Sequence, residues 1–230
     1  RLAALLHDVG HGPLSHTTED VMPSTKDLNI KVYDLRRKKK STRASHEDYT
    51  IKYITDSPLT SILREFFPEL DPIHIAVLID KTLKSPDDFF IEQGLDFRPI
   101  LSQLVSSELD VDRMDYLERD SYFTGTNYGR IDLNWLTSNL TYHILNEKLF
   151  LALNRRAIYT FDDFLISRHH IHLMVYFHHK ALVFEEMLNN YLSSADCKFF
   201  LPSDINEYTK YNDFRLYEHL ASSSNEWAQR

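Results

Sequence analysis

The sequence predicts an all-α fold with one minor β-hairpin near residues 142–153. Two observations lead to this prediction. Helix-starting signals recur along the chain, because a serine or aspartate that can cap a helix stands at several places directly before a proline or near an acidic residue. Only one segment shows the pattern of two strands joined by a short turn. We find no internal repeat.

Capping residues begin three of the expected helices: Ser45 with Asp48 three residues on, Ser57 before Pro58, and Asp71 before Pro72. We expect the last two of these helices to end near residues 67 and 83. Further helices are expected over residues 99–107, 108–121, 157–191 (one long helix or two abutting ones) and 204–221. Residues 24–45 are expected to form an exposed loop, and residues 86–96 a second loop.

The overall composition excludes several classes of protein. The chain has 26 basic and 34 acidic residues, a net charge of −8, so it is no wholesale basic nucleic-acid binder. Its five glycines form no glycine-rich phosphate loop. The single cysteine, Cys197, excludes an intramolecular disulfide and a cysteine-based zinc site, and it fits a reducing, cytoplasmic compartment. No apolar run of 18 residues predicts a membrane span, so we expect no membrane partner.

A dense histidine group stands at the start of the chain, in the sequence HDVGHGPLSH. His7 and Asp8 are adjacent, and His11 lies one helical turn beyond His7. Imidazole and carboxylate are the ligands that many divalent metals prefer, so the group predicts a metal site completed elsewhere in the chain. The alternative is a histidine-rich helix end with hydrogen-bonded rings.

Four other patterns each allow a functional and a purely structural interpretation. Asp112, Tyr116 and Asp120 fall on one face of a predicted helix, which could supply a remote carboxylate or be a solvated face of ion pairs. His46 at a helix start suits acid–base work, unless it is a surface His–Glu pair. Arg168 and Tyr176 share a helix face. This face could bind phosphate and sugar, or it could belong to a buried helix with amphipathic side chains. Residues 36–43 form a basic run, either solvated or an anion site.

These motifs, in this order, resemble the HD superfamily of metal-dependent phosphohydrolases over residues 1 to about 190. Within it they are similar to the deoxynucleoside triphosphate triphosphohydrolases, the dGTPase-like and SAM-and-HD-domain branch. The resemblance implies an HD-domain helical bundle over residues 1–193, and the start of a C-terminal helical region over 194–230. The chain begins within an apolar helix, so we expect residues upstream, including a fourth metal ligand.

The resemblance also assigns roles to individual residues. It implies that the metal ligands are His7, Asp8 and Asp112, and that the catalytic residues are His11, Glu19 and His46. It implies substrate contacts by His16, Arg113, Tyr116, Asp120, Arg168 and Tyr176. Glu19 stands where the best-known member has aspartate, and Arg113 where some members have lysine. The expected cofactor is a divalent ion, one of Mn, Fe, Mg, Ni or Zn.

The implied reaction is hydrolysis of a dNTP to deoxynucleoside and triphosphate. Expected partners are the dNTP, a nucleotide effector, nucleic acid bound weakly through residues 36–43, and further copies of the chain in a homodimer or homotetramer. Two alternatives stay open: an HD phosphohydrolase or phosphodiesterase acting on another nucleotide, and a nucleotide- or nucleic-acid-binding module without turnover.

Overall fold

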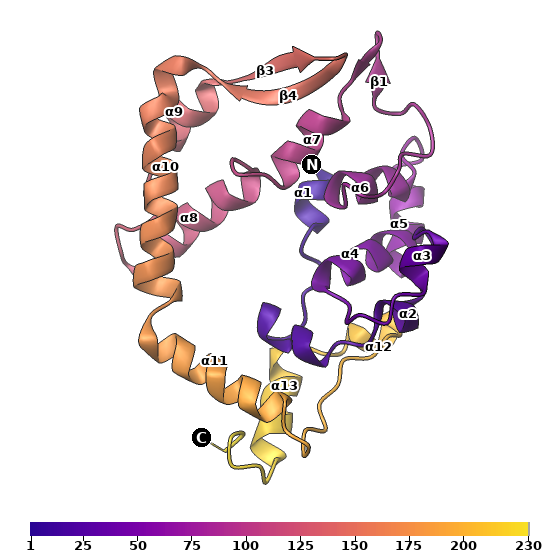
Figure 1. Ribbon diagram of the computed structural model, residues 1–230, viewed down its shortest axis with the longest axis vertical. Coiled ribbons are helices and arrows are strands. Elements are labelled where there is room, and N and C mark those ends of the chain that lie inside the picture. Colours follow the sequence, from indigo (N-terminus) through magenta and orange to yellow (C-terminus); the bar gives the residue numbers. More distant parts are fainter. Residues whose placement is uncertain (230) are drawn as a thin grey trace. The chain divides into compact units, whose positions relative to one another are not determined.

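The computed structural model describes residues 1–229 and contains two compact units. Unit 1 combines Arg1–Pro86 with the chain from Val183 onward, and unit 2 is Asp87–Leu182. Helices dominate both units, and the only sheet in the described chain is small, which confirms the mostly helical fold with a minor β element (Figure 1). No helix within residues 1–229 has the length and apolar character needed to cross a bilayer. The division at residue 193 stays a prediction.

Unit 1 is built around α4 (His46–Thr55), whose Tyr49, Ile51 and Ile54 are fully buried. The unit also contains α1 (Leu2–Leu6), the 3₁₀ helix η1 (Ser15–Val21), α2 (Thr25–Leu28), α3 (Leu35–Lys38), α5 (Pro58–Phe66), α6 (Pro72–Ile79), α12 (Ile205–Tyr208) and α13 (Asp213–Ser222). The helix α11 (His179–Leu192) enters this unit at Val183. Residues from both ends of the chain therefore share one core.

The capping signals predicted the starts of α4, α5 and α6 correctly. Ser45 and Asp48 form a reciprocal capping box at α4, and the side chains of Ser57 and Asp71 each accept a backbone N–H at their helix starts. The expected end of α6 near residue 83 is wrong, because the helix stops at Ile79. The Asp80 carboxylate accepts hydrogen bonds from the backbone N–H and hydroxyl of Thr82, which favours a turn there.

The expectation of an exposed loop over residues 24–45 is also wrong. This segment holds α2 and α3, and Leu28, Ile30 and Tyr33 are at most 3% exposed. Arg37 extends from α3 to the carboxylates of Asp48 and Asp80, at 3.1 and 2.5 Å. The three buried residues are apolar and stand among charged and polar neighbours. The charged composition of the segment therefore led to the wrong prediction.

Unit 2 contains α7 (Arg98–Val105), α8 (Val111–Thr124), α9 (Leu133–Ser138), the short η2 (Arg155–Ala157), α10 (Ile158–Ile171) and a π-helical turn, η3 (His172–Tyr176). Its core gathers residues of α8, α9 and α10 with the residues before α8: Leu109, Met114, Leu117, Leu136, Phe164 and Ile171. The π-helical turn separates α10 from α11, so the region 157–191 forms two helices rather than one.

The hairpin prediction is confirmed by β3 (Leu140–Leu145) and β4 (Lys148–Leu153), which pair antiparallel. Their turn residues Asn146 and Glu147 both have positive φ, at 48° and 61°, as a tight two-residue hairpin turn requires. The loop expected at 86–96 contains two further strands, β1 (Ile91–Glu92) and β2 (Leu95–Asp96), giving the sheet order β1-β2-β4-β3. Strands of two residues carry no alternation that a sequence could show.

Candidate active site

The His7–Asp8 pair lies at the end of α1 with its ligand atoms close together. The Nδ1 of His7 lies 2.9 Å from the carbonyl oxygen of Ala4, which can only accept, so Nδ1 carries the proton and Nε2 keeps its lone pair. That Nε2 lies 3.4 Å from Oδ1 of Asp8. A backbone carbonyl that fixes the tautomer in this way is the usual arrangement around metal-binding histidines. The pair therefore fits half of a metal site.

Gly10 lets the backbone after this pair pass against α4. A Cβ at Gly10 would lie 2.2 Å from the carbonyl oxygen of His46 and 2.4 Å from the nitrogen of Thr50, both backbone atoms that cannot move aside. The side chain of any other residue would displace the loop from α4. The contact brings His11, one residue on, up to the N-terminal turn of that helix.

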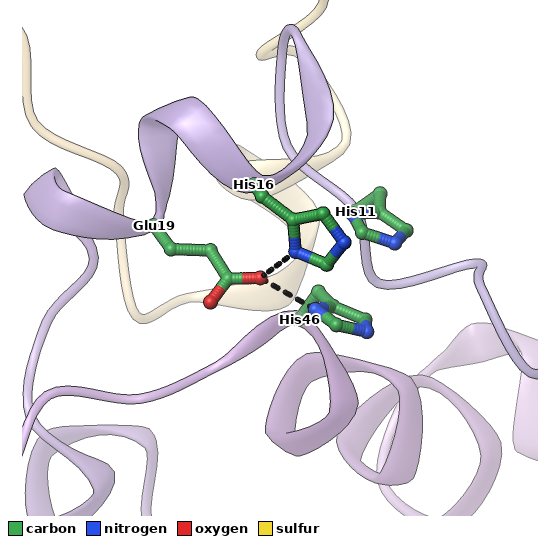
Figure 2. A group of neighbouring side chains, drawn as sticks. All are labelled: His11, His16, Glu19 and His46. Atoms are coloured by element: carbon green, nitrogen blue, oxygen red, sulfur yellow. Dashed lines mark hydrogen bonds and ion pairs between the residues drawn. The ribbon is translucent and has the colours of Figure 1, made fainter. Parts of the chain in front are cut away.

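Four side chains of unit 1 form a single cluster, drawn in Figure 2. Oε1 of Glu19 accepts hydrogen bonds from Nδ1 of His46, at 2.5 Å, and from Nδ1 of His16, at 3.0 Å. The ring of His11 stacks on that of His46, with centroids 3.9 Å apart and planes at 10°. Ligand atoms of all four residues lie within 4.8 Å of one another, so the group could also hold a metal ion.

The Glu19 carboxylate sets the chemistry of its two neighbours. Burial alone would raise the pKa of Glu19, but the hydrogen bonds from His46 and His16 outweigh burial and hold that pKa below its ordinary value. An ionised carboxylate only accepts, so both Nδ1 atoms are protonated, and each ring keeps its Nε2 for other partners. A single oxygen of Glu19, Oε1, bonds both rings at once.

His11 is harder to protonate than an ordinary histidine. Burial, followed by repulsion from His46, lowers the pKa of His11 to about 4. Its Nδ1 is buried with no hydrogen-bond partner among the described residues, and its Nε2 lies 3.7 Å from Oδ1 of Asp8. At neutral pH His11 is therefore a neutral imidazole, and its ring lies close to Asp8 as well as to His46.

Unit 2 contains the residues predicted to contact substrate, except His16, and also the predicted metal ligand Asp112. The α8 face holds Asp112, Arg113, Tyr116 and Asp120, all partly buried, while Met114 and Leu117 point into the core. The Tyr176 hydroxyl donates to Asp120 at 2.5 Å, and burial, followed by that carboxylate, raises the Tyr176 pKa. Burial also raises the pKa of Tyr116, whose ring lies 6.3 Å from that of Tyr176.

The two arginines predicted to contact substrate, Arg113 and Arg168, differ in how firmly their present partners hold them. Arg168 pairs with the exposed carboxylate of Glu108 at 2.8 Å, a partner that solvent competes for readily. The guanidinium of Arg113 instead bonds the carboxylate of Asp110, which is 2% exposed, and the carbonyl of Ser107. Arg168 is therefore the freer of the two to exchange its carboxylate for a phosphate.

The structure thus gathers the predicted residues in two sets, one in each unit. His11, Glu19 and His46 are together, with His16 in the same cluster although it was assigned to substrate. Asp112 lies in unit 2, so a single metal bound by His7, Asp8 and Asp112 stays a prediction. The motifs gave no hint of Thr50 and Tyr208, which bond the backbone of residues 7–10. Hydroxyls that bond a distant backbone leave no local pattern in a sequence.

No family model matches the chain. The uncharacterized protein MG461 homolog of Mycoplasma pneumoniae is 32% identical over 177 residues, 76% of this chain and 36% of that protein. The putative HD domain-containing protein L394 of Acanthamoeba polyphaga mimivirus is 26% identical over 233 residues, 98% of this chain and 44% of its own. A Dictyostelium discoideum protein named deoxynucleoside triphosphate triphosphohydrolase SAMHD1 homolog is 29% identical over 196 residues, 85% of this chain and 33% of its own.

Two of these names agree with the residues at the candidate site. The names HD domain-containing protein and SAMHD1 homolog support the HD superfamily. The chain spans less than half the length of each of the three relatives.

Proposed function

We propose that this protein is an HD-type, metal-dependent phosphohydrolase that hydrolyses dNTPs to deoxynucleoside and triphosphate. The observation that carries the proposal is the Glu19 cluster of His11, His16, Glu19 and His46, together with a His7–Asp8 pair whose ligand atoms lie 3.4 Å apart. Residues oriented by a carboxylate next to metal-ligating groups suit hydrolysis of a phosphate ester. The HD and SAMHD1 names of the relatives add support.

The metal would be held by His7, Asp8 and Asp112, and it is one of Mn, Fe, Mg, Ni or Zn. When bound, a divalent ion polarises phosphate oxygens and acidifies a water molecule. We place Arg168 on the phosphates and Tyr176, with its Asp120 partner, at the sugar. Tyr116, Arg113 and His16 would complete the substrate contacts.

In the reaction, water attacks the α-phosphorus and the bond to the 5′ oxygen breaks. Glu19 holds the ring of His46 by Nδ1, so its Nε2 can carry a proton to the departing oxygen. His11 is neutral at pH 7, so it donates a hydrogen bond to a phosphate oxygen rather than a positive charge. The products are then a deoxynucleoside with its 5′ hydroxyl and inorganic triphosphate.

The test is hydrolysis of each dNTP by purified protein with each of the five metals, with triphosphate and nucleoside separated by anion-exchange chromatography. We expect triphosphate release that EDTA abolishes and that Asp112→Ala lowers at least a hundredfold. Ser138→Ala, on the exposed side of α9, is the control and keeps full activity. Release of monophosphate, or turnover only of cyclic nucleotides, would move the protein to another branch of the superfamily.

We also propose a nucleotide effector, weak nucleic-acid binding through residues 36–43, assembly as a homodimer or homotetramer, and a cytoplasmic location. The basic run and the single cysteine support the nucleic-acid binding and the location, and the family resemblance supports the assembly. Binding of single-stranded DNA or RNA in a mobility-shift assay, together with no hydrolysis of any nucleotide, would favour a binding module without turnover.

A further inference from the structure

The segment that carries the candidate ligands, residues 7–12, is held from two sides by buried hydroxyl groups. We call this segment the histidine loop. The Thr50 hydroxyl donates to the carbonyl oxygen of His7 at 2.9 Å and accepts the backbone N–H of Gly10 at 3.0 Å. The Tyr208 hydroxyl donates to the carbonyl oxygen of Gly10 at 2.7 Å. Both side chains are almost wholly buried, at 0% and 2% exposed.

Thr50 fixes one side of the loop from the middle of α4. One hydroxyl bonds two backbone groups three residues apart, so it sets the spacing between His7 and Gly10. The same helix begins at His46, the ring on which His11 stacks. The same rigid helix therefore fixes the position of the histidine loop and that of the cluster around Glu19.

Tyr208 fixes the other side from a part of the chain 198 residues away. Its ring stacks on Tyr49 with centroids 3.9 Å apart, which places the hydroxyl independently of the loop itself. The hydroxyl also lies 3.2 Å from where a Cβ of Gly12 would stand, so the loop passes close over it. Beyond the loop, the backbone N–H of Leu14 donates to Asp213 at 3.0 Å.

We propose that Thr50 and Tyr208 are positioning residues that hold the histidine loop in register with His46. Neither side chain touches the reacting atoms. Each acts through the backbone that carries His7, Asp8 and His11. Because misplacement of a catalytic group by about 1 Å can cost about a hundredfold in rate, loss of either hydroxyl lowers turnover more than it lowers folding stability. The proposal rests on the phosphohydrolase function proposed above.

The chain offers a closely matched control for Tyr208. The Tyr49 side chain is 0% exposed, and its hydroxyl also donates to a backbone carbonyl at 2.7 Å, but its acceptor is Pro202, outside the loop, and this hydrogen bond is only partly buried. Tyr208→Phe and Tyr49→Phe therefore each remove one hydrogen bond to a backbone carbonyl and keep both stacked rings. For Thr50 the pair is Thr50→Val, which removes the hydroxyl at constant size, and Thr50→Ser, which keeps it.

The experiment compares these four variants with the wild-type chain in two measurements. In amide hydrogen exchange, we expect Tyr208→Phe and Thr50→Val to raise exchange over residues 7–12 at least tenfold, with Tyr49→Phe and Thr50→Ser within threefold of wild type. In steady-state hydrolysis of dGTP with Mn²⁺, we expect the first two to lose at least tenfold in kcat with KM changed less than twofold. Thr50→Ser should retain most of the wild-type kcat.

Equal effects of Tyr208→Phe and Tyr49→Phe on loop exchange and kcat would overturn the proposal for Tyr208. A loss in Thr50→Ser as large as in Thr50→Val would overturn it for Thr50. Should Tyr208→Phe not fold, the Thr50 pair decides. If the wild-type chain hydrolyses no nucleotide, the proposed function fails, and loop exchange in the metal-free protein alone decides the positioning role.

Discussion

His11 should make the metal-free protein less stable as the pH falls below neutrality. Its pKa is about 4 in the folded chain, against 6.5 for an ordinary histidine. In the pH range between these values the unfolded chain binds a proton that the folded chain does not. The sign is therefore fixed: the free energy of unfolding is greatest above pH 6.5 and falls as the pH drops toward 4.

The magnitude follows from the gap between the two values. At pH 5 the ring of the unfolded chain is protonated, and this pH lies about 1.5 units below the unfolded pKa. At about 1.4 kcal/mol per unit, proton binding therefore stabilises the unfolded state by about 2 kcal/mol between pH 7.5 and pH 5. The ring keeps 18% exposure, and solvent screening there reduces this contribution to about 1 kcal/mol. We expect His11→Gln to remove this part of the pH dependence.

The assay is urea unfolding of the wild type and of His11→Gln in EDTA at pH 7.5 and pH 5. Wild type should lose about 1 kcal/mol more than the variant between the two conditions. His143→Gln, at an exposed position of β3, is the control and should keep the wild-type dependence. If His11→Gln and wild type show the same difference between the two pH values, the assignment of His11 as a neutral buried ring is wrong.

Two further predictions follow from the same unit. Glu19→Gln leaves a neutral amide between two rings, so we expect kcat for dNTP hydrolysis to fall about 10–100-fold. The side chain of Glu19→Asp is one carbon shorter and no longer reaches both rings, so we expect kcat to fall by a similar factor. An unchanged kcat in Glu19→Gln would contradict the orienting role. Arg37→Met leaves the nearly buried carboxylates of Asp48 and Asp80 without their cation, which should cost about 2–3 kcal/mol of unfolding free energy in urea, and equal stability of variant and wild type would contradict it.

The sequence predicted what depends on near neighbours. Ser45, Ser57 and Asp71 begin their helices because a cap acts within three residues, and the Asn146-Glu147 turn follows from the strands it joins. The histidine motif is equally local, and the resemblance it supports drew attention to Glu19 and His46, which lie 27 residues apart and are bonded in the structure.

What the sequence did not predict depends on contacts between distant segments. Nothing near Tyr208 indicates that its hydroxyl bonds Gly10, because a tyrosine in a short helix has the same local appearance whether it is exposed or buried. The same holds for Leu28, Ile30 and Tyr33, which are isolated apolar residues among charges and become core only because α4 is beside them. Burial is a property of the assembled fold and leaves no period in so short a segment.

Asp48 shows how the local and the distant contacts combine at the candidate site. Its Oδ2 accepts the backbone N–H of Ser45 and so closes the capping box before His46. Its Oδ1 accepts from the Tyr33 hydroxyl at 2.6 Å and from Arg37 at 3.1 Å. The carboxylate that starts the helix is thus itself held by the segment expected to be a loop. Because His46 is the first residue of that helix, Tyr33 and Arg37 help to fix the position from which the His46 ring joins the cluster of His11, His16 and Glu19.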